Sequence, residues 1–253
     1  MKNNLKKNQI ARNFGRASAK YDDFAILQRQ VAQKLCQINA ANIKNSQNIL
    51  DLGCGTGFVS KNILEQFTNR NITQIDVSRQ MLAQNPFKTS KINADIENLP
   101  LRANIFDLIF ASLSFQWLKN LPYSLENIIK TAKKGGILSF ATLGDKTLQE
   151  LKVTGQKCQI NLAVNDFYSK KDLEQILQQK NYNFSLQKEE IKMNYSNFYD
   201  LLRSIKNIGA NASNSQFLNR SQFTKLSNFY LKNFNLENKV FATWQVLYIT
   251  IYL

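Results

Sequence analysis

Apolar residues in the first forty positions recur at intervals of three and four. Phe24, Leu27, Val31, Leu35 and Ile38 follow this spacing, which places them along one stripe of an α-helix. The pattern predicts an amphipathic helix that packs this stripe against a core.

From Asn48 onward, short apolar runs alternate with stretches of helical spacing. The runs read as strands are NILDL, ITQID, KINAD, FDLIFAS and GILSFAT, and helices are expected between them at 59–67 and 121–132. Strands that alternate with helices need crossover connections, which produce a mostly parallel sheet covered on both faces. Right-handed crossovers make such a sheet doubly wound.

The alternation loosens after Thr142. The elements expected there are helices at 146–157 and 169–179 and strands at 184–193 and 240–252. Between these two strands, one apolar helical face is formed by Phe198, Leu201, Leu202 and Ile205, and a further helix is expected at 221–233. We therefore expect inserted helices before the last strand, which either cap a site at the sheet edge or serve only in packing.

The 253 residues suit one domain, because no repeat or low-complexity linker divides them. The predicted fold class is α/β, with a doubly wound, mostly parallel, seven-stranded sheet. Its expected parts are N-terminal helices at 1–42, a core at 43–195, a helical lid insertion at 196–236 and a final strand at 237–253.

The composition excludes several chemistries. Histidine is absent, which rules out Ser-His-Asp and Cys-His nucleophilic catalysis and metal sites built on imidazole. Cys36, Cys54 and Cys158 lie far apart, so neither a zinc cluster nor a disulfide framework is expected. No secretory h-region or bilayer-spanning stretch is recognisable. We therefore expect a cytoplasmic protein with no metal and no membrane association.

The chain is strongly basic. Its 33 Lys and Arg exceed its 18 Asp and Glu, which leaves a net charge of +15. Such a charge favours acidic partners, namely nucleic acid, an anionic membrane or an acidic protein. A biased genome also explains it, since Lys, Asn and Ile are abundant throughout.

A glycine-rich turn follows the first predicted strand, with the sequence Asp51-Leu52-Gly53-Cys54-Gly55-Thr56-Gly57. Glycines allow a tight turn and a close approach to a ligand, and the next helix offers free amides. The spacing departs from the Gly-x-Gly-x-x-Gly of dinucleotide sites, where Asp51 would also repel a pyrophosphate. The acid suits a ligand with an amino group, although such a turn can be purely structural.

Further polar residues are expected at the same sheet edge. Asp76 ends the second strand, where a doubly wound sheet places a carboxylate that binds ribose hydroxyls. Asp95 follows the third strand and lies within reach of an adenine rim, although a carboxylate there is commonly a cap. The segment from Ser112 to Trp117 leaves the fourth strand at the chain reversal, where such sheets bind ligands. These residues predict one ligand site.

The Asp51 to Gly57 motif matches Asp/Glu-x-Gly-x-Gly-x-Gly, and the chain resembles class I S-adenosylmethionine-dependent methyltransferases, whose fold is Rossmann-like. More narrowly, four segments are similar to the malonyl-[acyl-carrier protein] O-methyltransferase family of biotin synthesis: FGRASAKY at 14–21, LQRQ at 27–30, LRSIKNIGA at 202–210 and LNRSQ at 218–222. The resemblance covers nearly the whole chain. It implies methyl transfer from S-adenosyl-L-methionine to the free carboxylate of a malonyl thioester, carried by acyl-carrier protein or by coenzyme A, as an early step of biotin synthesis.

The resemblance also implies roles for single residues. The glycine turn would pass beside the methionine part of the cofactor, with Asp51 facing its ammonium group. Asp76 would bind the ribose hydroxyls and Asp95 the adenine, while Tyr21 would close over the cofactor with Gln28. The implied cofactor-binding residues are Asp51, Gly53, Cys54, Gly55, Gly57, Asp76, Val77, Asp95, Ile96, Ser112 and Gln28.

This chemistry does not need the missing histidine, because an ionised carboxylate is already a nucleophile at neutral pH. Arg203 is expected to clamp that carboxylate, unless it is a solvated helix residue, and Tyr21 is the second catalytic candidate. Arg16 is another contender for the clamp or for carrier binding. Asn207, where the family commonly has Gly, and the lack of a basic residue beside Phe167 depart from the family pattern in the acyl pocket.

Other partners and functions stay open. An acidic carrier protein would be attracted by the basic chain, with Lys2, Lys6, Lys7 and Arg12 as candidate contacts. A methyltransferase of a quinone or small carboxylic acid is the main alternative, although it would be expected to lack the Arg203 segment. A nucleic-acid methyltransferase is less favoured, since the motif-like Asn-Pro-Phe at 85–87 precedes the third strand. A methyltransferase-like assembly factor is opposed by the complete set of acids.

Overall fold

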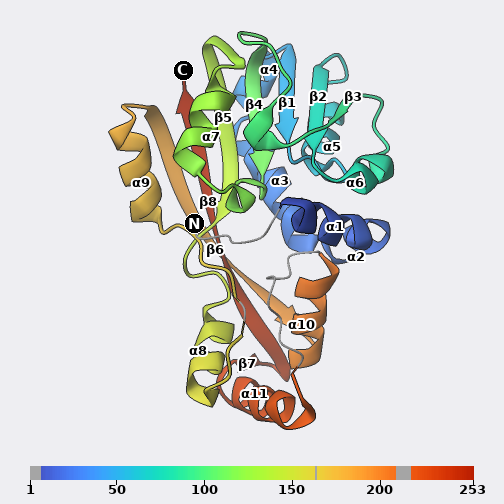
Figure 1. The fold of residues 1–253 in the computed structure, drawn as a ribbon, viewed down its shortest axis with the longest axis vertical. Coiled ribbons are helices and arrows are strands. Elements are labelled where there is room, and N and C mark those ends of the chain that lie inside the picture. The colour runs from blue at the N-terminus through green and yellow to red at the C-terminus, as the bar shows by residue number, and fades with distance from the viewer. Residues whose placement is uncertain (1–6, 163, 209–217) are drawn as a thin grey trace.

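The computed structural model describes residues 7–162, 164–208 and 218–253. A twisted sheet with helices on both faces forms one part, and a smaller group of helices surrounds the far ends of two long strands (Figure 1). The helices are α1 (Lys7–Ala17), α2 (Tyr21–Phe24), α3 (Ile26–Ile38), α4 (Ala40–Asn45), α5 (Phe58–Leu64), α6 (Arg79–Gln84), α7 (Leu121–Ile129), α8 (Gln149–Cys158), α9 (Lys170–Gln179), α10 (Phe198–Asn207) and α11 (Arg220–Asn233). The strands are β1 (Asn48–Leu52), β2 (Asn71–Asp76), β3 (Ser90–Asn93), β4 (Phe106–Ser112), β5 (Ala132–Leu143), β6 (Asn183–Tyr195), β7 (Asn235–Leu236) and β8 (Lys239–Tyr252).

The strand order is β3-β2-β1-β4-β5-β8-β6, and β7 pairs with β8 beside this path. Strands β1 to β5 pair in parallel, whereas β8 is antiparallel to both of its neighbours, β5 and β6. The seven-stranded path and the helices inserted before the last strand agree with the prediction. The two-residue β7 was missed, because so short a segment carries no periodicity.

The core lies on both faces of the sheet. In β1, Ile49 packs with one cluster, which includes α3 and α5, while Leu50 and Leu52 pack with the other. All three side chains are fully buried. Neighbouring residues of one strand can both be buried only when helices cover both faces, as expected for a doubly wound sheet.

The N-terminal apolar stripe is divided between two helices, which corrects the prediction of one. Leu27, Val31 and Leu35 are buried on α3, but Phe24 ends α2. The chain leaves helical geometry at Ala25, where ψ is 42°. Periodicity detected the shared face but not this backbone break.

The strands β6 and β8 extend beyond the rest of the sheet. Pairing of β5 with β8 begins at Leu143 and Val246, whereas β6 and β8 stay paired from there to Tyr195 and Val240. The parallel strands end at this edge, so the two long strands form a ribbon that projects past it. Helices α8, α10 and α11 gather around this ribbon (Figure 1).

Candidate functional site

The glycine turn after β1 adopts a backbone that favours glycine. Gly53 has a φ of 67°, and a Cβ built on it would lie 2.3 Å from Cβ of Ser114. Gly57 has a φ of 96°, and its Cβ would lie 2.7 Å from the Asn85 amide. Gly55, by contrast, faces open space. The turn thus packs tightly at both ends and leaves its middle accessible to a ligand.

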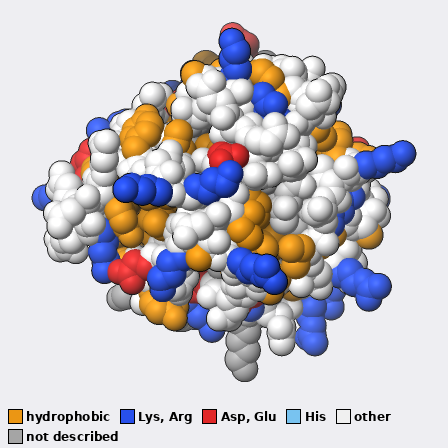
Figure 2. Space-filling model, turned by 90° about the horizontal axis from the view of Figure 1, so that it is seen from above, with side chains coloured by type: hydrophobic (Ala, Val, Ile, Leu, Met, Phe, Trp, Pro, Cys, Tyr) orange, Lys and Arg blue, Asp and Glu red, His pale blue; other side chains and the backbone are white. Residues whose placement is uncertain are grey.

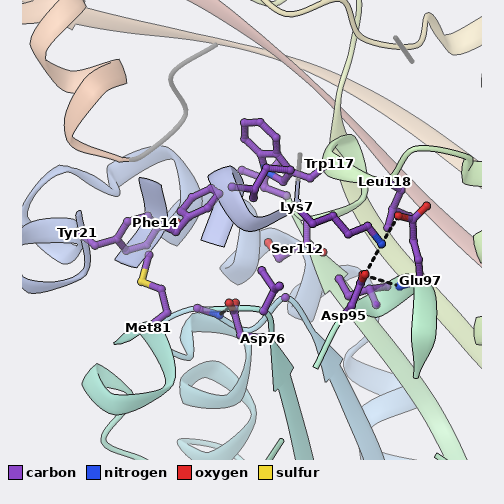
Figure 3. Close-up of a pocket in the computed structure, with 17 residues that line it drawn as sticks. Lys7, Phe14, Tyr21, Asp76, Met81, Asp95, Glu97, Ser112, Trp117 and Leu118 are labelled. Atoms are coloured by element: carbon purple, nitrogen blue, oxygen red, sulfur yellow. Dashed lines mark hydrogen bonds and ion pairs between the residues drawn. The ribbon is translucent and has the colours of Figure 1, made fainter. Parts of the chain in front are cut away.

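Two adjoining cavities lie over this turn. The edge cavity follows the carboxyl ends of β1, β2 and β4, and its lining includes Tyr21, Gly53, Gly55, Asp76, Val77, Asp95, Ile96 and Ser112 (Figure 3). The turn cavity adjoins the glycine turn itself, and its lining includes Tyr21, Gln28, Asp51, Gly53, Cys54, Gly55 and Ser112. The two cavities share four of these residues, and together they are called the cleft. Gly57 lines neither cavity, so glycine is required at this position for close packing and not for access of a ligand.

Asp76 is held at the end of β2 by two backbone amides. Its Oδ2 accepts from Gly55 N at 2.9 Å and its Oδ1 from Ser78 N at 2.7 Å. Burial raises the pKa of Asp76, and these two donors oppose that effect. Each carboxylate oxygen accepts more than one hydrogen bond, so this side chain can also bind a vicinal diol in the edge cavity.

Asp51 is a buried carboxylate with an unused oxygen. Its Oδ2 accepts from Ser60 Oγ at 3.2 Å and from Gln74 Nε2 at 3.5 Å, but its Oδ1 has no partner among the described residues. Burial raises the pKa of Asp51 to about 7. A buried acceptor that lacks a partner carries a free-energy cost, which a cationic amino group in the turn cavity would relieve.

Asp95 is engaged by a residue that the sequence did not indicate for this site. Its Oδ1 accepts from Glu97 N at 2.9 Å, which caps a short 3₁₀ turn. Its Oδ2 pairs with Lys7, which reaches in from α1 and also pairs with Glu97 (Figure 3). Lys7, expected only as a carrier contact, thus lines the edge cavity.

Aromatic side chains cover the edge cavity. Phe14 of α1 meets Trp117 edge to face with ring centres 5.6 Å apart, and Tyr21 stacks on Phe58 at 6.4 Å. Burial raises the pKa of Tyr21, so its hydroxyl stays neutral. These ring contacts join elements far apart in the sequence.

A third cavity, the ribbon cavity, lies between α2, α3, α10 and the projecting ends of β6 and β8. Its volume is about 340 Å³, and Arg203 and Gln28 are among its lining residues. The Arg203 guanidinium carbon lies 6.0 Å from the centre of the Phe24 ring. Gln28 also lines the turn cavity, so this residue borders both cavities. Arg203 therefore lines the ribbon cavity and not the cleft.

Within residues 7–162, 164–208 and 218–253, no helix is long and apolar enough to cross a membrane. No group of three or more Cys, Asp or Glu residues in the same part of the chain is arranged to hold a metal ion.

Comparison with known proteins identifies the family. Residues 50–140 match the family model of a methyltransferase domain. A malonyl-[acyl-carrier protein] O-methyltransferase 2 from Ilyobacter polytropus is 34% identical over 253 residues, which cover 96% of this chain and 97% of that protein. A second enzyme of this name, from Pectobacterium atrosepticum, is 33% identical over 82% of this chain and 81% of its own length. The chain belongs to the malonyl-[acyl-carrier protein] O-methyltransferase family.

Solved structures share the fold of this family member. A putative methyltransferase from Bacillus halodurans has a TM-score of 0.62 at 14% identity, covering 87% of this chain and 97% of its own. A plantazolicin methyltransferase in complex with SAH has a TM-score of 0.57 at 15% identity, with 97% and 95% covered. The class I methyltransferase fold and the methyltransferase class expected from the glycine motif are confirmed.

The chemistry of the cleft fits S-adenosyl-L-methionine, the methyl donor of this enzyme class. The unpaired oxygen of Asp51 suits an ammonium group, and the spare acceptor capacity of Asp76 suits ribose hydroxyls. The open space beside Gly55 leaves room for the chain that joins them.

Proposed function

We propose that this protein transfers a methyl group from S-adenosyl-L-methionine to the free carboxylate of a malonyl thioester on acyl-carrier protein. The observation that carries the proposal is the position of Gln28, which lines both the turn cavity and the ribbon cavity. A donor held by the cleft and an acceptor held beside Arg203 would therefore meet at one side chain. The names of the curated relatives support this acceptor.

In this proposal the cleft holds the cofactor along its length. Asp51 takes the ammonium group, Asp76 the ribose hydroxyls, and Asp95 with Ile96 the adenine edge, while Tyr21 covers the middle. When bound, S-adenosyl-L-methionine supplies a methyl group activated by its sulfonium charge. The aromatic side chains over the cleft support this assignment, because they would shield a bound cofactor from water and so strengthen the electrostatic interactions around it.

Arg203 is proposed to hold the carboxylate of the acceptor in the ribbon cavity. No ion pair joins Arg203 to a carboxylate within the described residues, and a guanidinium binds two carboxylate oxygens at once. A lone pair of one oxygen forms the new bond to carbon, while the electron pair of the broken carbon–sulfur bond stays on sulfur. No proton changes place, so the reaction needs no general base.

The carrier protein is proposed to approach through long-range attraction. Figure 2 views the end of the molecule that carries α4, and Lys and Arg are spread over it with few Asp or Glu. On this end of the molecule the positive charge is spread out rather than gathered in one patch, and it would attract an acidic carrier. Arg12 and Arg16 are exposed on α1 and stay candidate contacts, whereas Lys2 and Lys6 lie outside the described residues. A cytoplasmic location and an early step of biotin synthesis are part of this proposal.

The proposed acceptor is tested with cofactor labelled in its methyl group. Malonyl-loaded carrier, acetyl-loaded carrier, aconitate and RNA are offered in parallel. We expect label only on the malonyl carrier, as a base-labile ester. Equal labelling of the malonyl and acetyl carriers, or labelling of aconitate or RNA alone, would rule out the proposal.

The role of Arg203 is tested separately. A hydrogen bond to a charged group contributes about 1.5–3 kcal/mol, so Arg203→Ala should lower kcat/KM for malonyl carrier by roughly 10- to 150-fold. Cofactor affinity should change by no more than a few-fold, because Arg203 lies outside the cleft. Lys206→Ala is the matched control, since Lys206 is exposed on the same helix. Unchanged turnover in Arg203→Ala would eliminate this assignment.

A further inference from the structure

The ribbon cavity has a polar wall formed by the projecting ends of β6 and β8. Met193, Tyr195 and Trp244 all line it. Met193 pairs with Ala242, and Tyr195 with Val240, while Trp244 pairs with Ile191. Paired residues of an antiparallel ribbon point to the same side, so the phenol and the indole share one face. Tyr195 and Trp244 therefore reach toward each other across that face.

A hydrogen bond fixes the direction of the Tyr195 hydroxyl. The indole Nε1 of Trp244 donates to Tyr195 Oη at 3.2 Å. An indole is a donor only, so the phenol oxygen must be the acceptor and its own hydrogen points elsewhere. Trp244 is only 4% exposed, which holds this geometry in place.

The Tyr195 hydroxyl has a second polar neighbour, the Ser204 hydroxyl of α10, which forms a side-chain hydrogen bond with it. Ser204 Oγ donates to Leu201 O at 2.9 Å and lines the same cavity. Its oxygen can therefore accept the phenol hydrogen until a ligand carboxylate, which is a stronger acceptor, takes its place. Burial raises the pKa of Tyr195, so the phenol keeps its hydrogen. The cavity wall thus presents a neutral hydroxyl donor, whose oxygen is held in place by the hydrogen bond from Trp244.

We propose that the Tyr195 hydroxyl donates a hydrogen bond to the acceptor carboxylate in the ribbon cavity, with Trp244 as the residue that positions it. The inference rests on the proposed function and deepens it by naming a second contact for the same acceptor. Arg203 and Gln28 line the same cavity, so a carboxylate there can lie between the cationic and the neutral donor.

A neutral donor suits a reaction in which the acceptor loses its charge. The attacking oxygen forms the bond to the methyl carbon, and the ester keeps one carbonyl oxygen that still accepts a hydrogen bond. An ion pair with a guanidinium weakens when the negative charge disappears, whereas a bond from a phenol persists. Tyr195 would therefore orient the acceptor before and after transfer, without withdrawing as much charge from the nucleophile as a cation does.

The test uses Tyr195→Phe, which removes one hydroxyl and little volume. A lost hydrogen bond to a charged group predicts a fall in kcat/KM for malonyl carrier of roughly 10- to 100-fold. The affinity for S-adenosylhomocysteine and the melting temperature should stay close to those of the wild type. Tyr199→Phe is the matched control, because Tyr199 is 58% exposed on α10 and should leave turnover unchanged.

Trp244→Phe tests the positioning residue. It should lower kcat/KM less than Tyr195→Phe, and the double variant should be no worse than Tyr195→Phe alone, because Trp244 is proposed to act through that hydroxyl. Fully additive losses would contradict the positioning role. Wild-type kcat/KM in Tyr195→Phe would overturn the whole inference, and so would a loss that follows cofactor affinity.

A binding measurement separates this inference from the proposed function. The chain has two tryptophans, so in a Trp117→Phe background Trp244 is the sole fluorescent indole and reports on the ribbon cavity. Malonyl-pantetheine should change its emission, and Tyr195→Phe in that background should weaken the binding about tenfold or more. Acetyl-pantetheine, which has no carboxylate, should show no dependence on Tyr195. If binding behaves in this way but the wild-type protein, which keeps Trp117, transfers no methyl, the proposed function fails and the Tyr195 contact stands. If methyl is transferred but Tyr195→Phe binds normally, the contact fails alone.

Discussion

Cofactor affinity should rise with pH, because Asp51 must lose a proton before it can hold an ammonium group. The carboxylate is 1% exposed, and its Oδ1 has no partner among the described residues. Burial raises its pKa from 3.8 to about 7. The free protein therefore holds a proton on Asp51 below pH 7 and in about half of the molecules near pH 7, and binding of a cation releases it.

The size of the effect follows from the fraction of ionised Asp51. With a pKa of about 7, this fraction is about 0.1 at pH 6 and about 0.9 at pH 8, so affinity should increase about tenfold across this interval. The stability of the free protein should change in the opposite direction. The folded state binds the proton more tightly than the unfolded chain, so stability is lost as the pH rises from 3.8 to about 7.

Isothermal titration calorimetry with S-adenosylhomocysteine measures the affinity without turnover. Titrations in two buffers of different ionisation enthalpy also count the protons released. Burial raises the pKa of Asp76 as well, so a control ligand is needed. Methylthioadenosine keeps the ribose but lacks the amino group, and its binding reports the contribution of Asp76 alone.

The variant Asp51→Asn supplies the decisive comparison, because an amide cannot titrate. It should bind S-adenosylhomocysteine weakly, with the pH dependence reduced to that of methylthioadenosine. A flat affinity profile in the wild type would refute the reasoning. An unchanged slope in Asp51→Asn would assign the proton to another group.

Three further predictions concern the turn, the ribose contact and the ribbon. Gly53→Ala should lower the stability more than Gly135→Ala in thermal unfolding. Both glycines have a positive φ, but of the two only Gly53 has a side chain within 4 Å of the added Cβ. Equal losses of about 1–2 kcal/mol would mean that backbone strain alone causes the destabilisation. Asp76→Ala should weaken cofactor binding by about 1–3 kcal/mol in calorimetry, and an unchanged affinity would contradict its role. Glu150→Ala should destabilise the fold by about 1–3 kcal/mol in denaturant titration. The Thr243 amide, which donates to Glu150 Oε2 at 2.9 Å in the wild type, would be left buried without an acceptor. A stability equal to wild type would show that water replaces the carboxylate.

The contacts that complete the site were beyond sequence reasoning. The ion pair of Lys7 with Asp95 joins residues 88 positions apart, and the bond of Trp244 to Tyr195 spans 49. Neither pairing leaves a periodic signal, since each depends on how α1 folds back over the sheet or how far β6 and β8 extend. The placement of Gly57 outside the cleft likewise depends on Asn85, which a different turn brings close.

Local patterns in the sequence determined most of the elements, the mostly parallel character of the sheet and the sheet edge that carries the acids. They sufficed because strand and helix periodicities are local, and because right-handed crossovers leave few ways to connect them. Only the tertiary structure decided that Gln28 borders both the cleft and the ribbon cavity and that Arg203 and Tyr195 line the same cavity. Those facts depend on side chains brought together by packing between distant segments, where burial and unused hydrogen-bonding groups, rather than spacing along the chain, define the chemistry.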